Sequence, residues 1–137
     1  MTGKKEAHLS MIQGVVTRLG QNSFLLKGWS VLLVSALLAL GAASSEELVL
    51  VVAFLPVLAF WGLDGYFLWQ ERLFRKLYDH VRDQDEEEVD YSMDVDVVRM
   101  QAASPTWTRA TFSRTLIAFH AILLVTVLVI FLIVAAG

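Results

Sequence analysis

Residues Leu116 to Ala136 read LIAFHAILLVTVLVIFLIVAA and contain no formal charge. At a rise of about 1.5 Å per residue, a helix of this length crosses the roughly 30 Å hydrocarbon core of a bilayer. Two further apolar runs, Phe24 to Ala43 and Leu48 to Trp69, contain one charged residue each. Pro56, near the middle of the second run, predicts a kink and not a break. The sequence therefore predicts an all-α membrane protein with three transmembrane helices.

The composition supports the same class. The chain has 137 residues, of which 56% are hydrophobic and 18% charged, whereas soluble domains are about 45–50% apolar and about 25% charged. This length predicts a single membrane domain over residues 1–137, with too little chain outside the bilayer for a conventional enzyme fold. The absence of cysteine excludes disulfides, thiolate zinc sites and iron–sulfur clusters. Because no phosphate loop, dinucleotide fingerprint or nucleophile elbow occurs either, we expect no enzyme, no cofactor and no metal site.

The distribution of basic residues predicts the topology. Every Lys and Arg precedes or opens the first span or lies between the second and third spans, and the connection Ser44 to Glu47 has none. The positive-inside rule then places the N-terminus and the long second connection in the cytoplasm, with Gly137 at the outer face. A secretory signal peptide is the alternative for the first run, but its apolar stretch of about 7–15 residues would be shorter.

The N-terminal segment, residues 1–22, carries apolar side chains on about half of a helical circumference. These are Leu9, Met11, Ile12, Val15, Val16 and Leu19. The pattern predicts an amphipathic helix that lies on the inner leaflet and leads into the first span. Packing against a cytoplasmic helix of a partner is the alternative.

Residues 70–112 form the predicted cytoplasmic region: a helix that continues the second span, an acidic linker, and a helix that restarts at Ser104-Pro105. The apolar stripe of the first helix comprises Leu73, Phe74, Leu77, Tyr78 and Val81. Together with Glu71 and Arg72, we predict that it contacts the N-terminal helix, another subunit or a partner. A solvated helix that only anchors the second span is the alternative.

Residues 89–97 alternate apolar and polar side chains, the period of a half-buried strand. The apolar positions are Val89, Tyr91, Met93, Val95 and Val97. A single strand would have to pair between subunits or add to the edge of a partner's sheet. Otherwise the segment is an extended acidic linker. The carboxylates lack the glycine turn and closing glutamate of a calcium loop, so we expect no cation site.

Three ionisable residues lie at a similar depth in the predicted spans: Lys27, Asp64 and His120. An intramembrane ionisable residue is by default a functional hypothesis with a named partner, and we predict that Lys27 pairs with Asp64 and that His120 lies nearby. Snorkelling of Lys27 to the headgroups is the alternative. We find neither the additional polar residues nor the internal repeat that a transporter would bring. The basic patches are too small to predict nucleic-acid binding.

Two stretches, Trp61 to Tyr78 (WGLDGYFLWQERLFRKLY) and Asn22 to Trp29 (NSFLLKGW), resemble small bacterial membrane proteins of the SLATT-like and RipA-like groups. The resemblance covers about residues 8–82, and the third span departs from the two-span pattern of those groups. It implies an oligomeric inner-membrane protein, in the SLATT case a pore-forming or membrane-perturbing effector of anti-phage defence. It also implies that Asp64, Glu71 and Arg72 are candidate functional residues.

Two functional hypotheses follow. The first is a homo-oligomeric protein of the bacterial cytoplasmic membrane, a defence-associated effector or accessory that permeabilises the membrane when a cytoplasmic partner triggers it. The second is a non-toxic anchor or scaffold that recruits a soluble enzyme complex through its cytoplasmic loop. The expected partners are the lipid bilayer, further copies of the chain and a cytoplasmic protein, with no nucleic acid.

Overall fold

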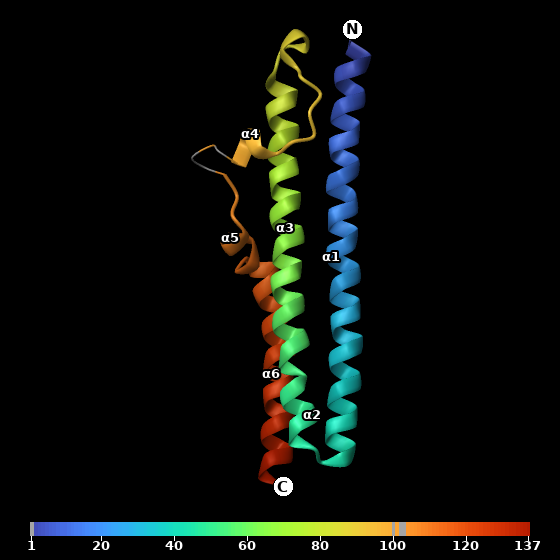
Figure 1. The fold of residues 1–137 in the computed structure, drawn as a ribbon, viewed down its shortest axis with the longest axis vertical. Helices are drawn as coiled ribbons and strands as arrows, with labels where there is room; N and C mark the ends of the chain where they lie inside the picture. The colour runs from blue at the N-terminus through green and yellow to red at the C-terminus, as the bar shows by residue number, and fades with distance from the viewer. Residues whose placement is uncertain (1, 100, 102–103) are drawn as a thin grey trace.

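The computed structural model describes residues 2–99, 101 and 104–137. The described chain is almost entirely helical (Figure 1). Its elements are α1 (Thr2–Ser44), α2 (Glu47–Val52), α3 (Phe54–Asp83), the 3-10 turn η1 (Glu86–Glu88), α4 (Asp96–Arg99), α5 (Trp107–Thr111) and α6 (Arg114–Ala136). Three stretches, α1, α2 together with α3, and α6, are long and apolar enough to cross a membrane. The prediction of an all-α chain with three apolar spans is confirmed at this level.

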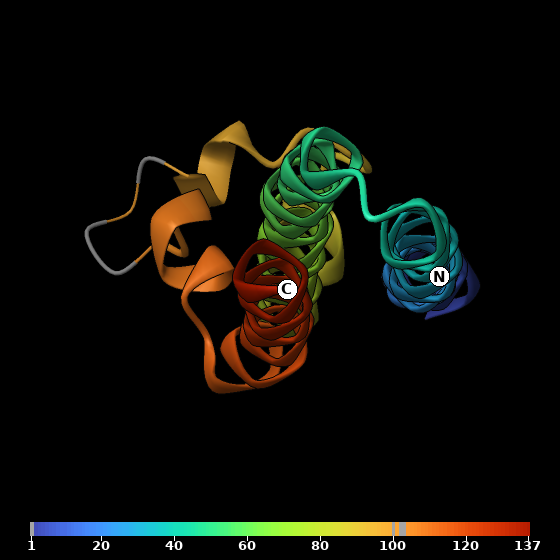
Figure 2. The ribbon, with the colours of Figure 1, turned by 90° about the horizontal axis from the view of Figure 1, so that it is seen from below.

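The three long helices lie side by side (Figures 1 and 2). The antiparallel helices α1 and α3 run together over nearly their whole length, and α6 packs along the half of this pair that is remote from the N-terminus. The start of α1 and residues 84–99 lie toward one end of the molecule, the N-terminal end. Gly137 and the turn between α1 and α2 lie at the other, the C-terminal end. In that turn Ser45 has a φ of 55° and the Glu46 amide donates to the Gly41 carbonyl at 3.0 Å.

Pro56 explains the interruption between α2 and α3. The break falls at Ala53, whose amide is shared between the carbonyls of Val49 and Leu50 at 3.2 Å each. Proline has no amide hydrogen to donate to the carbonyl of Val52, and its ring crowds that carbonyl. The sequence argument identified Pro56 as the cause, but it predicted a kink without a break. The structure instead interrupts the helix at Ala53, three residues before the proline.

The N-terminal segment does not form the predicted separate helix. Helix α1 continues without interruption through residues 20–22 into the first apolar span, so its N-terminal part follows the axis of that span (Figure 1). Its apolar face is covered within the chain, because Ile12 is packed in one buried core with Leu73 and Leu77 of α3. The side chain of Lys5 also donates to the carbonyls of Arg82 and Gln84 at the end of α3.

The alternative of a strand over residues 89–97 is also wrong, since no strand occurs in the described part of the chain. The segment returns along α3 as an irregular strap that ends in α4 (Figure 1). Of the five predicted strand residues, Val89 is buried, Met93 and Val95 pack against the core, and Tyr91 and Val97 are 40% and 47% exposed.

The polar residues of the same segment explain why no partner strand is needed. The backbone amides of Ser92, Asp94 and Asp96 do not donate to a neighbouring strand. Each donates instead to a side chain two residues earlier, at 3.0–3.1 Å. Such local turns compete with a sheet ladder. The alternation therefore reflects one face packed on helices and one face that satisfies the backbone.

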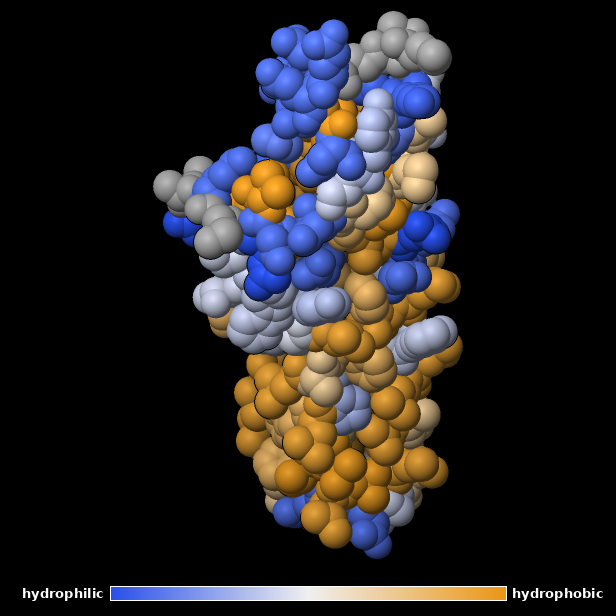
Figure 3. Space-filling model, turned by 45° about the horizontal axis from the view of Figure 1, so that its top comes forward, coloured by the Kyte–Doolittle hydropathy of each residue, from blue (hydrophilic) through white to orange (hydrophobic). Residues whose placement is uncertain are grey.

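On the face that Figure 3 shows, the N-terminal end is polar, the long part below it is mainly apolar, and polar atoms return at the opposite tip. Phe24, Leu32 and Ile133 are 77%, 70% and 65% exposed on the apolar part. Contiguous apolar surface of this extent is unusual for a soluble monomer. It is the surface that a lipid environment would cover.

Candidate functional site

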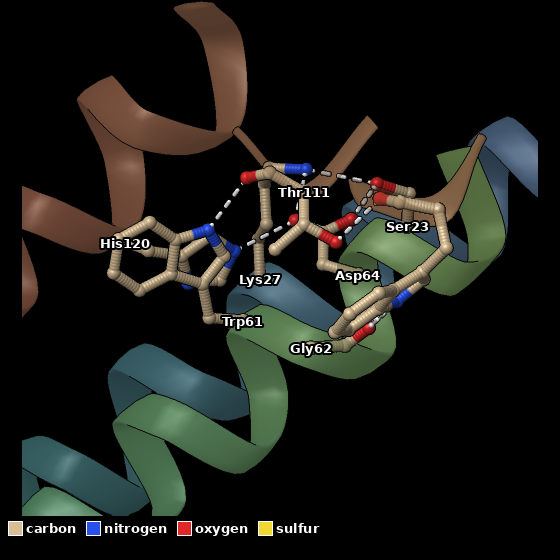
Figure 4. A network of polar contacts seen from close by, with 8 residues as sticks. Ser23, Lys27, Trp61, Gly62, Asp64, Thr111 and His120 are labelled. Atoms are coloured by element: carbon tan, nitrogen blue, oxygen red, sulfur yellow. Dashed lines mark hydrogen bonds and ion pairs between the residues drawn. The ribbon is translucent and has the colours of Figure 1, made fainter. Parts of the chain in front are cut away.

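The three helices meet at a buried polar network formed by Ser23, Lys27, Asp64 and His120 (Figure 4). Ser23 and Lys27 lie one helical turn apart on α1 and therefore share a face. Asp64 on α3 and His120 on α6 are both fully buried. Sequence reasoning predicted that Lys27, Asp64 and His120 share a depth, and the structure brings all three into contact.

The carboxylate of Asp64 is the centre of the network. Its Oδ2 lies 2.6 Å from Nζ of Lys27 and 2.8 Å from Nε2 of His120. Its Oδ1 accepts a hydrogen bond from the hydroxyl of Ser23, which in turn accepts one from Lys27 at 2.8 Å. One carboxylate thus binds side chains from both neighbouring helices. Such saturation is what allows an ion pair to persist at low dielectric.

The surroundings of His120 define its tautomer. Its Nδ1 has no hydrogen-bond partner among the described residues, and its ring stacks on Trp61 with centroids 5.8 Å apart and an interplanar angle of 10°. A proton on Nδ1 would be a buried donor without an acceptor, which is costly. A proton on Nε2, donated to Asp64, avoids this cost. In that form the network carries one positive charge on Lys27 and one negative charge on Asp64.

Three indole groups attach the segment before α6 to α3. The Nε1 of Trp61 donates to the Thr111 carbonyl at 2.8 Å, and the Nε1 of Trp69 donates to the Pro105 carbonyl at 3.0 Å. In the opposite direction Trp107 donates to the Gly62 carbonyl at 3.0 Å. We call these three bonds the indole clamp.

Ser23 and the indole clamp were missed by sequence reasoning. Trp61, Gly65 and Trp69 follow one another at intervals of four residues, so they share one face of a helix. This spacing was the available signal. The acceptors are backbone carbonyls, which every residue has, so the residue types in the sequence do not show which carbonyls accept these bonds.

The apolar stripe predicted for the helix that continues the second span packs within the chain. Leu73, Leu77 and Val81 are buried against α1, with Phe74 and Tyr78 partly buried around them. Glu71 pairs with Arg75 at 3.5 Å, and Arg72 is half-buried. The predicted contact with the N-terminal helix is therefore present, and the alternative of a merely solvated helix is wrong.

Within the described ranges, no three His, Asp or Glu side chains converge as metal ligands would.

No protein-family model, curated protein or solved structure significantly matches the chain. The network itself consists of the Lys27–Asp64 ion pair and the His120 ring that contacts the same carboxylate. Such an arrangement can fix three helices relative to one another.

Replacing Trp61 by phenylalanine is expected to destabilise the protein by about 1 kcal/mol, the net value of one hydrogen bond. The aromatic stack on His120 would be retained, while the bond to the Thr111 carbonyl would be lost. Thermal unfolding of the detergent-solubilised protein measures the effect. Trp29→Phe is the control, because Trp29 is 59% exposed on the apolar surface, and it should leave the unfolding temperature unchanged.

Proposed function

We propose that the chain is a three-span anchor of the bacterial cytoplasmic membrane that presents an acidic docking segment, residues 83–96, to a basic cytoplasmic protein. The observation that carries this proposal is the closure of the intramembrane ion pair inside one chain. Lys27 and Asp64 neutralise each other at 2.6 Å between α1 and α3. The proposed role of the network is to fix the helices that support the docking segment.

Burial of the network favours an anchor over a conducting path. The side chains of Asp64 and His120 have no exposed surface, and that of Lys27 is 18% exposed. Residues that line an aqueous path must meet water. A carboxylate already bound by three side chains also has little capacity left for a passing ion.

The docking segment carries many negative charges and is attached to the core of the protein. Residues 83–96 include eight acids and no Lys or Arg. Asp85, Glu87, Glu88 and Asp90 are exposed, while Val89, between them, is buried in the core shared by α1 and α3. An acidic surface of this kind accelerates association with a basic partner and selects against acidic ones. We propose that the partner is a subunit of a soluble enzyme complex.

The homo-oligomeric effector is the second candidate. The observation that favours it is the exposure of large apolar side chains on α1 and α6, with Leu32 at 70% and Ile122 at 66%. Copies of the chain could pack through these faces. This candidate requires a discrete multi-copy particle and loss of membrane potential when the protein is triggered.

Neutralising two exposed acids tests the proposed docking. A photo-crosslinking residue at Val97, which is 47% exposed, should capture one basic soluble protein in cells. We expect Glu87→Gln/Glu88→Gln to lower the affinity for that purified partner about tenfold, since exposed ion pairs contribute up to about 1 kcal/mol each. The salt dependence of binding should weaken in the same variant.

The matched control is Glu46→Gln/Glu47→Gln, which removes the same charge at the C-terminal end of the molecule, where both glutamates are exposed. It should bind the partner as the wild type does, and the membrane potential should be unchanged in all three strains. Equal losses in both double variants would contradict the docking segment. A ring-sized oligomer that depolarises cells would favour the effector instead.

A further inference from the structure

The chain that follows the docking segment has the opposite charge. From Val97 to Gly137 the sequence contains three arginines and no Asp or Glu. Arg109 on α5 and Arg114 at the start of α6 are exposed. Neither has an ion-pair partner in the described part of the chain. Two guanidinium groups are thus presented outward, and no acid among the described side chains binds them.

Contacts with α3 place α5 and the start of α6, which carry Arg109 and Arg114, at the boundary of the apolar region. Helix α5 lies beside Gly62 and Gly65, through the bond from Trp107 and through close contact with Thr111. Helix α6 begins at Arg114 and contains 23 residues, a length of about 35 Å at 1.5 Å per residue. Because the hydrocarbon core is roughly 30 Å thick, a membrane-spanning α6 places Arg114 at the headgroup level.

The aromatic residues near these arginines are also exposed. Trp107 and Phe112 present 44% and 58% of their surface, and aromatic side chains are enriched at the interface between lipid and water. The indole clamp holds the backbone of this segment against α3. The arginines are consequently carried on a positioned element, which lowers the entropic cost of binding.

We propose that Arg109 and Arg114 bind the phosphates of anionic phospholipids in the leaflet at the N-terminal end of the molecule. A guanidinium group can donate two parallel hydrogen bonds to one phosphate. The N-terminus of α6, the positive end of its dipole, faces the same layer. The attraction would hold the protein at a fixed depth, with the acidic docking segment displaced toward the N-terminal end. This site requires that the helices span a bilayer, and it is independent of the partner of the docking segment.

Lipid selectivity of the purified full chain tests the site. Dioleoyl-phosphatidylglycerol and dioleoyl-phosphatidylcholine are titrated into the detergent-solubilised protein, and bound lipids are counted by native mass spectrometry. The wild type should prefer the anionic lipid about tenfold or more. Arg109→Gln/Arg114→Gln should abolish the preference, because each basic residue near an anionic surface is worth roughly fivefold in affinity.

The matched control is Arg75→Gln/Arg82→Gln. These two arginines are exposed as well, but they pair with Glu71 and Asp79 of α3 at 3.5 and 3.4 Å. This control should retain the lipid preference. If the Arg109/Arg114 double variant loses helical signal, the two single variants replace it, each with a roughly fivefold expected loss.

Three results would overturn the site: equal binding of the two lipids by the wild type, retention of the preference without Arg109 and Arg114, or an equal loss in the control. Partner crosslinking at Val97 reads a different part of the molecule. If the Arg109/Arg114 double variant loses lipid selectivity but its partner is still crosslinked at Val97, the result supports the lipid site. If no partner is crosslinked at Val97 while lipid selectivity behaves as expected, only the docking role is contradicted.

Discussion

Replacing Asp64 by alanine is expected to destabilise the protein by about 3 kcal/mol, the lower part of the range for breaking a buried ion pair. The change would remove the acceptor of Lys27, of His120 and of the Ser23 hydroxyl at once. Lys27 would then be a charge at membrane depth without a counter-charge. The lower part of the range applies because its side chain is 18% exposed, so that it can extend toward the headgroups.

The free energy of unfolding in lipid nanodiscs measures this effect. The matched control is Asp79→Ala, which removes an exposed aspartate whose partner, Arg82, lies 3.4 Å away. It should cost less than about 1 kcal/mol, as surface pairs do. A cost for Asp64→Ala no larger than that of the control would contradict the structural role of the network.

Removing both charges separates the ion pair from the rest of the site. Lys27→Met combined with Asp64→Ala should be more stable than Asp64→Ala alone, because the double variant leaves no unpaired charge in the span. The difference from additivity reports the coupling between the two side chains. Additive effects would mean that Lys27 does not depend on Asp64.

The spans and the depth of the network could be predicted because both depend on local sequence. The thickness of a bilayer fixes the length of an apolar helix, so ionisable residues near corresponding ends of antiparallel spans reach the same level. The shared depth predicts that Lys27, Asp64 and His120 lie together, and the structure brings them into contact. Ser23 could have been added, since it lies one turn from Lys27 on the same face.

The partners of the two amphipathic stripes could not be predicted with the same certainty. A hydrophobic face shows that it is covered, but it does not show by what. A lipid leaflet, another subunit or a neighbouring helix of the same chain could each cover it. In the structure the stripes of α1 and α3 cover each other, with Ile12 against Leu73 and Leu77.

Residues 89–97 pose the same difficulty. Their alternation fits a strand, but it fits equally a strap with one packed face and local side-chain turns.

Replacing Gly65 by alanine is expected to destabilise the protein by about 2–3 kcal/mol, at the upper end of the usual cost of overpacking. A Cβ atom at this position would lie 2.9 Å from Cβ and 3.0 Å from Cα of Thr111, and closer still to its hydroxyl. A backbone atom cannot rotate away as the end of a long side chain can. Helix α5 must therefore move, which strains the indole clamp and the approach of α6 to α3.

Two other glycines supply the controls for Gly65→Ala. Gly62 lies one turn earlier on α3, and its Cβ would meet only Trp107, at 3.8 Å, whereas a Cβ on Gly28 of α1 would meet nothing within 4 Å. Since alanine favours helix over glycine by up to about 1 kcal/mol, both controls should be neutral or slightly stabilising. Thermal unfolding compares the three, and tryptophan fluorescence reports the clamp. A neutral Gly65→Ala variant would show that α5 is not held against α3 at Thr111. Partial recovery on adding Thr111→Ala would locate the strain at that contact, because this second change removes the nearest atom and leaves the backbone in place.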